Sequence, residues 1–165
     1  MTQADRILER LAMRAGRHLL RAGRYAATAE SCTGGWIAKA MTDIAGSSGW
    51  FAEGFVTYSN DAKRRRLGVP HAVLDKNGAV SRATARAMAL GALKRSGAQI
   101  AVAVTGIAGP GGAVPGKPVG TVWLAWAVKR PRSIQVTAEF RRFKGDRETV
   151  RRKTVRAALL GFLAR

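Results

Sequence analysis

The sequence has few residues that could hold a metal ion or a disulfide: one cysteine, Cys32, and two histidines in 165 residues. A single cysteine excludes an intramolecular disulfide and is typical of a reducing compartment. No group of His, Cys, Asp and Glu residues has the spacing of a metal site, so we expect neither a metal nor another cofactor. No apolar run approaches the roughly 20 residues that span a bilayer, and the N-terminus lacks the apolar core of an export signal. We therefore expect a cytoplasmic protein that does not bind membranes.

Acidic residues are also scarce, since ten Asp and Glu oppose 29 Lys and Arg and leave a net charge of +19. Such a balance suits nucleic acid, an anionic membrane face or a phosphorylated small molecule. The basic residues are spread over many segments, and only Phe140 and Phe143 flank a basic run, so a base-stacking platform has little support. We expect a small-molecule substrate and keep a basic nucleic-acid-binding module as the alternative.

Apolar segments alternate with amphipathic ones along the chain, which predicts an α/β protein. The third apolar segment is apolar almost throughout, as in a strand covered on both faces, and the last two read as an antiparallel pair. Residues 69–78 are expected to form a connector. Strands are predicted at Tyr25–Glu30, Gly54–Tyr58, Gln99–Thr105, Thr121–Lys129 and Ser133–Phe140, and helices at Gln3–Ala22, from Trp36, at Asp61–Leu67, Ala83–Leu93 and Asp146–Leu163.

The segment from Ala29 to Gly35 joins the first predicted strand to the first helix that follows it. Open α/β sheets usually bind ligands at such junctions, where unpaired N–H groups at the helix start favour anions. Ser31 lies at this point and is a candidate nucleophile. An ordinary helix cap would use the same residue types, so that interpretation stays open.

The segment from Thr105 to Gly112, closing at Lys117–Gly120, is too rich in Gly and Pro for a core element and is expected to be a loop at the end of the third strand. It matches neither the Walker loop nor the dinucleotide fingerprint. A phosphate cradle and a long connector are both compatible with it.

Three motifs together resemble the family of the CinA C-terminal domain, in the right order and over nearly the whole chain. They are Ala29–Gly35, Gly54–Asn60 with Lys63, and Thr105–Pro110 continuing through Lys117–Trp123. Stand-alone members of this family are the PncC-type nicotinamide-nucleotide amidohydrolases, which act in pyridine nucleotide recycling. The resemblance implies one domain over residues 1–165, a three-layer α/β/α sandwich and a mixed, mostly parallel sheet of about five strands.

The activity that the resemblance implies is hydrolysis of the carboxamide of nicotinamide mononucleotide (NMN) to nicotinate mononucleotide and ammonia. An inactive nucleotide-binding domain is a second alternative. Amide hydrolysis needs a nucleophile, a proton acceptor and an oxyanion site. Both histidines lie far from the motifs, so the expected base is Lys63 or Tyr58, to which the resemblance also points. Burial or nearby cations would have to lower the pKa of a catalytic lysine, and the roles of the two residues are left unranked.

The remaining expectations concern substrate contacts and assembly. Cys32 is a rival nucleophile, but it has no histidine partner and its side chain should point away from that of Ser31. Exposed Trp50 and Phe51 would make a homodimer reasonable. The expected substrate contacts are an oxyanion site at Thr33, Gly34 and Gly35, a phosphate site at Thr105, Gly106, Gly109 and Lys117, and a partner for the cationic pyridinium ring at Glu30, which could instead pair with an arginine of the fold.

Overall fold

Five strands form one mixed sheet in the computed structural model, which describes residues 2–165. The strand order is β2-β1-β3-β4-β5. β1 runs parallel to β2 and β3, whereas β4 is antiparallel to β3 and to β5. The parallel register pairs Glu30 of β1 with both Val56 and Val104. The strands are β1 (Ala26–Glu30), β2 (Phe51–Val56), β3 (Ile100–Gly106), β4 (Thr121–Arg130) and β5 (Ser133–Arg142).

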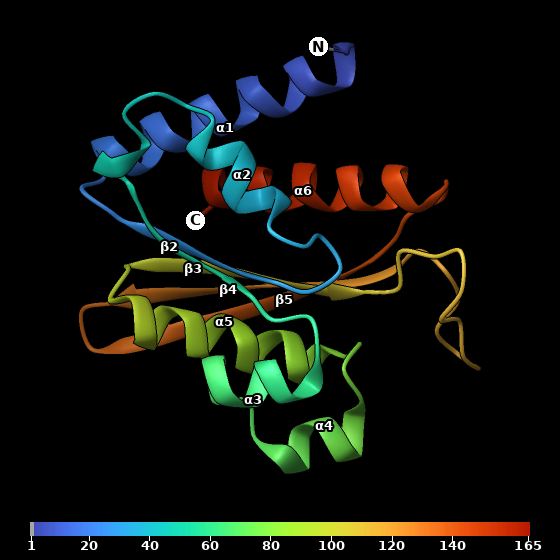
Figure 1. Cartoon of the computed structure of the whole chain (residues 1–165). Helices are drawn as coiled ribbons and strands as arrows, with labels where there is room; N and C mark the ends of the chain where they lie inside the picture. The colour runs from blue at the N-terminus through green and yellow to red at the C-terminus, as the bar shows by residue number, and fades with distance from the viewer. Residues whose placement is uncertain (1) are drawn as a thin grey trace.

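The helices cover both faces of this sheet (Figure 1). One face carries α1 (Gln3–Arg21), α2 (Trp36–Thr42) and α6 (Arg147–Leu163), which we call the upper layer. The other carries α3 (Asn60–Leu67), α4 (His71–Asn77) and α5 (Arg82–Ser96), the lower layer. A short 3-10 helix, Ser47–Gly49, precedes β2. The arrangement confirms the expected three-layer sandwich with a mixed five-stranded sheet.

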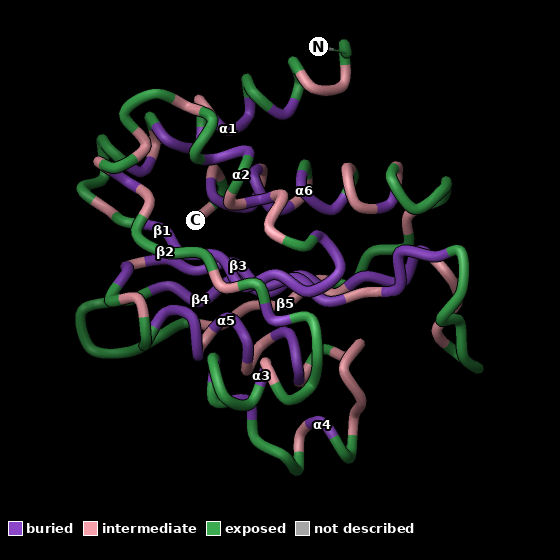
Figure 2. Tube along the Cα trace, viewed as in Figure 1, coloured by how far each residue is buried: buried purple, intermediate pink, exposed green. Residues whose placement is uncertain are grey.

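Each face of the sheet has its own hydrophobic core, and the central strands are buried throughout (Figure 2). Alternation along β1 sends Ala26 into the upper core and Ala27 into the lower one. In the lower layer α5 packs closely on α3, because a Cβ on Gly91 would lie 2.0 Å from the carbonyl oxygen of Leu67. Gly91 thus lets α3 lie close against α5, which matters for the side chains that α3 carries.

Two expectations are wrong. The supposed connector at residues 69–78 contains α4, with Pro70 at its N-terminal boundary and Gly78 at its C-terminal one. Trp50 is not exposed, because only 3% of it is accessible and its ring lies where a Cβ on Gly16 would come within 2.6 Å. Phe51 is not an exposed loop residue either, because it begins β2 and packs partly buried against the upper core. The argument for a homodimer from these two residues is lost, and the homodimer stays a prediction.

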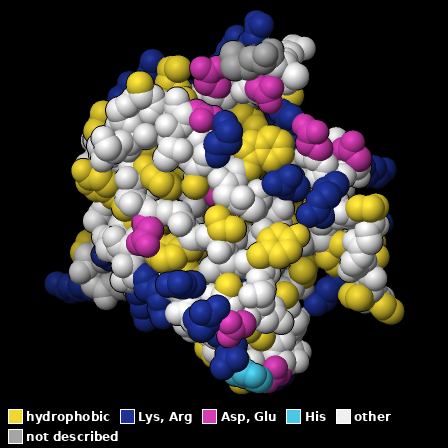
Figure 3. Space-filling view, viewed as in Figure 1, with side chains coloured by type: hydrophobic (Ala, Val, Ile, Leu, Met, Phe, Trp, Pro, Cys, Tyr) yellow, Lys and Arg dark blue, Asp and Glu magenta, His cyan; other side chains and the backbone are white. Residues whose placement is uncertain are grey.

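The surface is basic in several separate places rather than in one patch on the face that Figure 3 shows. This agrees with the dispersed Lys and Arg residues of the sequence. None of the helices within residues 2–165 combines the length and hydropathy that crossing a membrane would require.

Candidate active site

Three strand ends meet around Ser31. β1, β2 and β3 are parallel neighbours, so their carboxyl ends lie at one edge of the sheet, where α/β proteins bind ligands. Ser31 and Thr57 directly follow β1 and β2, and Thr105 lies near the end of β3. Backbone hydrogen bonds continue the pairing, since the Ser31 N–H donates to Val104 O at 3.1 Å and the Thr57 N–H to Glu30 O at 2.8 Å. The predicted nucleophile is therefore fixed between two neighbouring segments.

Lys63 reaches Ser31 from the lower layer. Ser59 caps the start of α3 with its side-chain oxygen, which places Lys63 one turn into the helix. The Lys63 Nζ lies 3.0 Å from Ser31 Oγ and donates to the carbonyl oxygens of Thr57 and Tyr58, each at 3.0 Å. The hydroxyl and the amine thus converge within hydrogen-bond distance, although 32 residues separate them in the sequence.

The amine of Lys63 is buried without a counter-charge. Its residue is 1% exposed, Ser31 is 8% exposed, and within residues 2–165 no carboxylate pairs with this lysine. Burial lowers the pKa of Lys63 below its ordinary value of 10.5 because a charged amine loses hydration. A neutral amine has two N–H groups for the two carbonyls and a lone pair for the Ser31 hydroxyl. Its surroundings suit a base.

Glu30 has a structural role that differs from the expected one. The side chain is fully buried, and its two carboxylate oxygens accept hydrogen bonds at the start of α2, where a negative charge is favoured. The four donors are Thr33 Oγ1 at 2.6 Å and the N–H groups of Gly35 at 3.1 Å, Ile37 at 2.9 Å and Ala38 at 2.8 Å. Within residues 2–165 no arginine pairs with Glu30, and its carboxylate holds the turn that carries Ser31.

Of the three N–H groups expected to form an oxyanion site, only that of Thr33 is free. Gly34 and Gly35 adopt φ values of +61° and +95°, a backbone region that glycine enters without strain. The Gly34 N–H donates to Ser31 O at 3.1 Å, and the Gly35 N–H is bonded to the Glu30 carboxylate. Among the described residues, the N–H groups of Cys32 and Thr33 have no acceptor. An oxyanion site would therefore use Cys32 and Thr33 rather than the two glycines.

Cys32 itself does not compete with Ser31 as a nucleophile in this structure. It is buried and belongs to the upper core, the cluster that also contains Ile37 and Met41. Burial raises the pKa of the Cys32 thiol to about 12. A thiol with such a pKa is protonated and unreactive at neutral pH.

Tyr58 contributes its backbone rather than its phenol to the serine–lysine pair. Its side chain is 62% exposed, and its hydroxyl accepts a hydrogen bond from Arg147 Nη2 at 3.2 Å. Within residues 2–165 no hydrogen bond joins this phenol to Ser31 or Lys63. Arg147 also donates to Gly109 O at 2.7 Å. It therefore links the exposed tyrosine to the glycine-rich loop.

The residues expected to grip a phosphate are tied to the fold. Thr105 is buried, and its hydroxyl donates to Ala79 O at 2.8 Å, while Lys117 Nζ donates to Asn77 O at 3.1 Å. These bonds attach the end of β3 to Ala79, between α4 and α5, and the loop to Asn77 at the end of α4. Gly106 and Gly109 allow close packing, since a Cβ would lie 2.8 Å from Thr121 O or 2.7 Å from a methyl group of Val119, respectively. The loop leaves the body of the molecule beyond this point (Figure 1).

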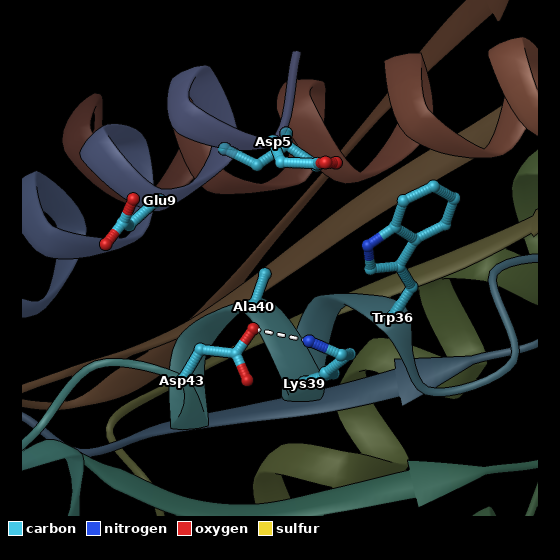
Figure 4. Close-up of a pocket in the computed structure, with 7 residues that line it drawn as sticks. Asp5, Glu9, Trp36, Lys39, Ala40 and Asp43 are labelled. Carbon is cyan, nitrogen blue, oxygen red and sulfur yellow. Dashed lines mark hydrogen bonds and ion pairs between the residues drawn. The ribbon is translucent and has the colours of Figure 1, made fainter. Parts of the chain in front are cut away.

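A hollow lies beside the turn in the upper layer. One cavity of about 530 Å³ is lined by Gly34, Gly35 and Trp36 of the turn together with Asp5, Lys39 and Arg151. A second, of about 480 Å³, shares Trp36 and continues between α1 and α2, where the Lys39–Asp43 ion pair forms one wall (Figure 4). Ser31 lines neither cavity, so these hollows adjoin the serine without containing it.

Sequence reasoning missed two arginines of α6. Arg147 contacts Tyr58 and Gly109, as described above, and Arg151 donates from Nε to Cys32 O at 3.1 Å and from Nη2 to Thr33 O at 2.9 Å. More than 110 residues separate Arg151 from these carbonyls. The local signal is weak, because Arg-rich helix faces are usually solvated. The one hint is the Asp146 cap, which marks a helix start of the kind found at sheet edges.

Together the fold and the site define a three-layer α/β protein with a buried serine–lysine pair at the end of its first strand. The chain belongs to the family of the CinA C-terminal domain, whose family model matches residues 8–165. The resemblance carried by the three motifs is thereby confirmed.

Relatives of known name support this membership. The chain is 56% identical over 153 residues to the nicotinamide-nucleotide amidohydrolase PncC of Pseudomonas putida, covering 93% of each chain. It is 50% identical over 157 residues to the protein of the same name from Escherichia coli K12, covering 94% of this chain and 92% of that one. A crystal structure of the competence/damage inducible protein CihA from Agrobacterium tumefaciens superposes with a TM-score of 0.91 at 51% identity, over 96% of this chain and 94% of that one.

Proposed function

We propose that this protein hydrolyses the carboxamide of NMN to nicotinate mononucleotide and ammonia, with Ser31 as nucleophile and Lys63 as base. The observation that carries the proposal is the 3.0 Å contact between Ser31 Oγ and a lysine amine that burial favours in the neutral form. The names of the relatives from Pseudomonas putida and Escherichia coli supply the substrate.

The first half of the reaction forms an ester on the enzyme. Lys63 takes the proton of the Ser31 hydroxyl while Ser31 Oγ attacks the amide carbon, and the carbonyl oxygen becomes an oxyanion. The N–H groups of Cys32 and Thr33 are the free donors that could stabilise this oxyanion. When the tetrahedral intermediate collapses, the carbon–nitrogen bond breaks and the protonated Lys63 returns its proton to the departing nitrogen, which leaves as ammonia.

The second half releases the acid. Water attacks the ester carbon, Lys63 takes a proton from the water, and the ester bond to Ser31 Oγ breaks with return of that proton to the serine. Nicotinate mononucleotide leaves and the enzyme is restored. The same lysine therefore acts first as base and then as acid in each half, which requires a pKa nearer to neutrality than that of an exposed lysine.

Substrate contacts follow from what surrounds the serine. We place the phosphate on the side of the Thr105–Gly112 loop, where Arg147 and Lys117 are the nearby cations identified above. The exposed phenol of Tyr58 lies between this loop and the strand ends and can hold the ring or its amide. Glu30 takes no part in binding, since the turn uses its carboxylate.

The test is release of ammonia from NMN by purified protein in the presence of a metal chelator. Ser31→Ala should reduce the rate at least about a hundredfold, the scale expected for loss of a nucleophile. Ser48→Ala makes the same chemical change at an exposed serine and should leave the rate unaltered. Thermal unfolding of each variant reports whether the fold is kept.

Four outcomes would contradict the proposal. An undiminished rate in Ser31→Ala would remove Ser31 from the mechanism, and loss of the rate in Cys32→Ala instead would transfer the role to the thiol. Binding of NMN without release of ammonia would identify an inactive nucleotide-binding domain. Salt-sensitive affinity for DNA or RNA that survives Ser31→Ala would favour the nucleic-acid-binding alternative.

A further inference from the structure

The turn after Ser31 holds its peptide groups in fixed directions. The carbonyl oxygen of Ser31 accepts the Gly34 N–H at 3.1 Å. In a trans peptide the N–H points opposite to the carbonyl oxygen, so this bond also directs the Cys32 N–H outward from the turn. Neither the Cys32 nor the Thr33 N–H has an acceptor among the described residues. Two free donors next to a nucleophile are the groups that an oxyanion site requires.

Arg151 holds the next two peptides from the upper layer. Its Nε donates to Cys32 O at 3.1 Å and its Nη2 to Thr33 O at 2.9 Å. A guanidinium is planar and presents parallel N–H groups, so one arginine grips two successive carbonyls, whereas a lysine amine is a point donor. The ring of Trp36 supports the guanidinium, whose Cζ lies 5.3 Å from the ring centroid. Arg151 is therefore fixed on both sides.

The grip on Cys32 O determines the direction of the Thr33 N–H, because both belong to one trans peptide. With the carbonyl oxygen turned toward α6, the N–H turns away from α6. Lys63 approaches Ser31 from the opposite layer of the sandwich. The positively charged guanidinium bound to the carbonyl oxygen also polarises this peptide, which makes its N–H a stronger hydrogen-bond donor.

We propose that Arg151 is a positioning residue for the oxyanion site. By binding Cys32 O it keeps the Thr33 N–H aimed at the reacting carbonyl, and by binding Thr33 O it holds the peptide whose Gly34 N–H bonds Ser31 O and so directs the Cys32 N–H. The inference rests on the proposed function for its substrate, but not for its geometry. Arg151 acts through the backbone and does not touch the substrate, so its loss should affect the transition state more than ground-state binding.

The experiment compares Arg151→Gln and Arg151→Lys with the matched control Arg152→Gln. Arg152 is the next residue and also lies over Trp36, with its Cζ 5.1 Å from the ring centroid, but it pairs with Asp5 and Glu148 instead of the turn. Arg151→Gln should lower kcat for ammonia release about tenfold to a hundredfold, with KM nearly unchanged. The pH at which the rate is half-maximal should stay constant, since Lys63 is not contacted. The kcat of Arg151→Lys should lie between those of Arg151→Gln and the wild type. The kcat of Arg152→Gln should match that of the wild type.

A second readout separates this inference from the proposed function. A fluorophosphonate labels an activated serine: Ser31 Oγ bonds to phosphorus, fluoride leaves, Lys63 takes the hydroxyl proton, and the developing P–O⁻ needs the same oxyanion donors. The labelling rate should fall in Arg151→Gln as kcat does. If the wild type is labelled but releases no ammonia from NMN, the proposed function fails while the effect of Arg151→Gln on labelling still tests the inference.

Three results would overturn the role of Arg151. A raised KM with unchanged kcat would make it a substrate-binding residue. Unchanged kcat and an unchanged labelling rate in Arg151→Gln would leave it without influence on the oxyanion. An equal loss of kcat in Arg152→Gln would mean that the contact of the arginines with the Trp36 ring matters, rather than the hydrogen bonds of Arg151 to the turn. Failure of the wild type to react with either reagent would refute both proposals.

Discussion

Two basic side chains approach the turn after β1 from opposite faces of the sheet, and they differ in what they touch. From the lower layer, Lys63 reaches the hydroxyl of Ser31 and is itself almost fully buried. From the upper layer, Arg151 reaches only carbonyl oxygens and stays partly exposed. The lower contact is to a reacting group, whereas the upper contact is to the frame that holds it.

The chemistry of the two side chains explains this division. A lysine amine can be made neutral by burial, and burial lowers the pKa of Lys63. A guanidinium stays protonated at every pH at which the protein works, so it can donate hydrogen bonds and charge but cannot accept a proton. Proton transfer is therefore assigned to the lower layer, and fixed electrostatic support to the upper one.

The largest effect is expected where the lower contact is broken. Lys63→Met should lower kcat about 10²–10⁴-fold, the range for loss of a general base. Lys63→Arg should be nearly as inactive despite keeping a cation, because an arginine cannot take the serine proton. Ammonia release from NMN measures both, and Lys76→Met removes an exposed lysine of α4 as the control. An active Lys63→Arg would break the comparison drawn between the two layers.

The pH dependence of the wild type sharpens the same point. The pKa of Lys63 lies below 10.5, so the neutral and active form accumulates as pH rises and kcat/KM should reach half of its maximum at a pH below 10.5. The sign follows from the role as base, since protonation at lower pH blocks proton transfer. A rate that falls as pH rises through this range would contradict the assignment.

An intermediate effect is expected from the carboxylate inside the turn. Glu30→Gln keeps the size of the side chain but removes a charge that accepts four hydrogen bonds, and its amide nitrogen cannot accept any of them. The free energy of unfolding should fall by about 3 kcal/mol, as for loss of buried hydrogen bonds to a charged group. Urea denaturation measures this change.

Glu53→Gln on the exposed surface of β2 is the control for this substitution and should alter stability by less than about 0.5 kcal/mol. If Glu30→Gln keeps full stability but weakens NMN binding, the residue contacts the substrate after all. The role of Glu30 as the anchor of the turn would then be wrong.

Much of the lower contact could be predicted from sequence. Ser31 and Lys63 both follow predicted strands, and parallel neighbouring strands bring their carboxyl ends to one edge. The direction of single side chains could not be predicted. Successive residues of an extended segment face opposite ways, and nothing local determines that Thr57 is buried while Tyr58 is exposed.

The upper contact was beyond sequence reasoning for a different reason. Arg151 meets the turn only because α6 packs beside α2 in the folded chain, and its segment has the composition of any solvated basic helix. Glu30 illustrates a related limit of sequence reasoning. A glutamate that accepts hydrogen bonds from the start of a helix and a glutamate that binds a substrate cannot be told apart by residue type. The helix α4 could have been predicted, since Pro70 before it and Gly78 after it are the usual boundary residues of a helix.

The smallest effect should come from the phenol of Tyr58, which within residues 2–165 is bonded neither to Ser31 nor to Lys63. Tyr58→Phe removes a hydroxyl that is exposed and bonded to Arg147, while the backbone oxygen that binds Lys63 remains. Loss of one such hydrogen bond, worth about 1 kcal/mol, should reduce kcat/KM about fivefold and leave the pH profile unchanged. A loss comparable to that of Lys63→Met, with a shifted profile, would mean that the phenol carries the proton when substrate is bound. The reacting group would then depend on a third side chain besides the two that approach the turn from opposite faces.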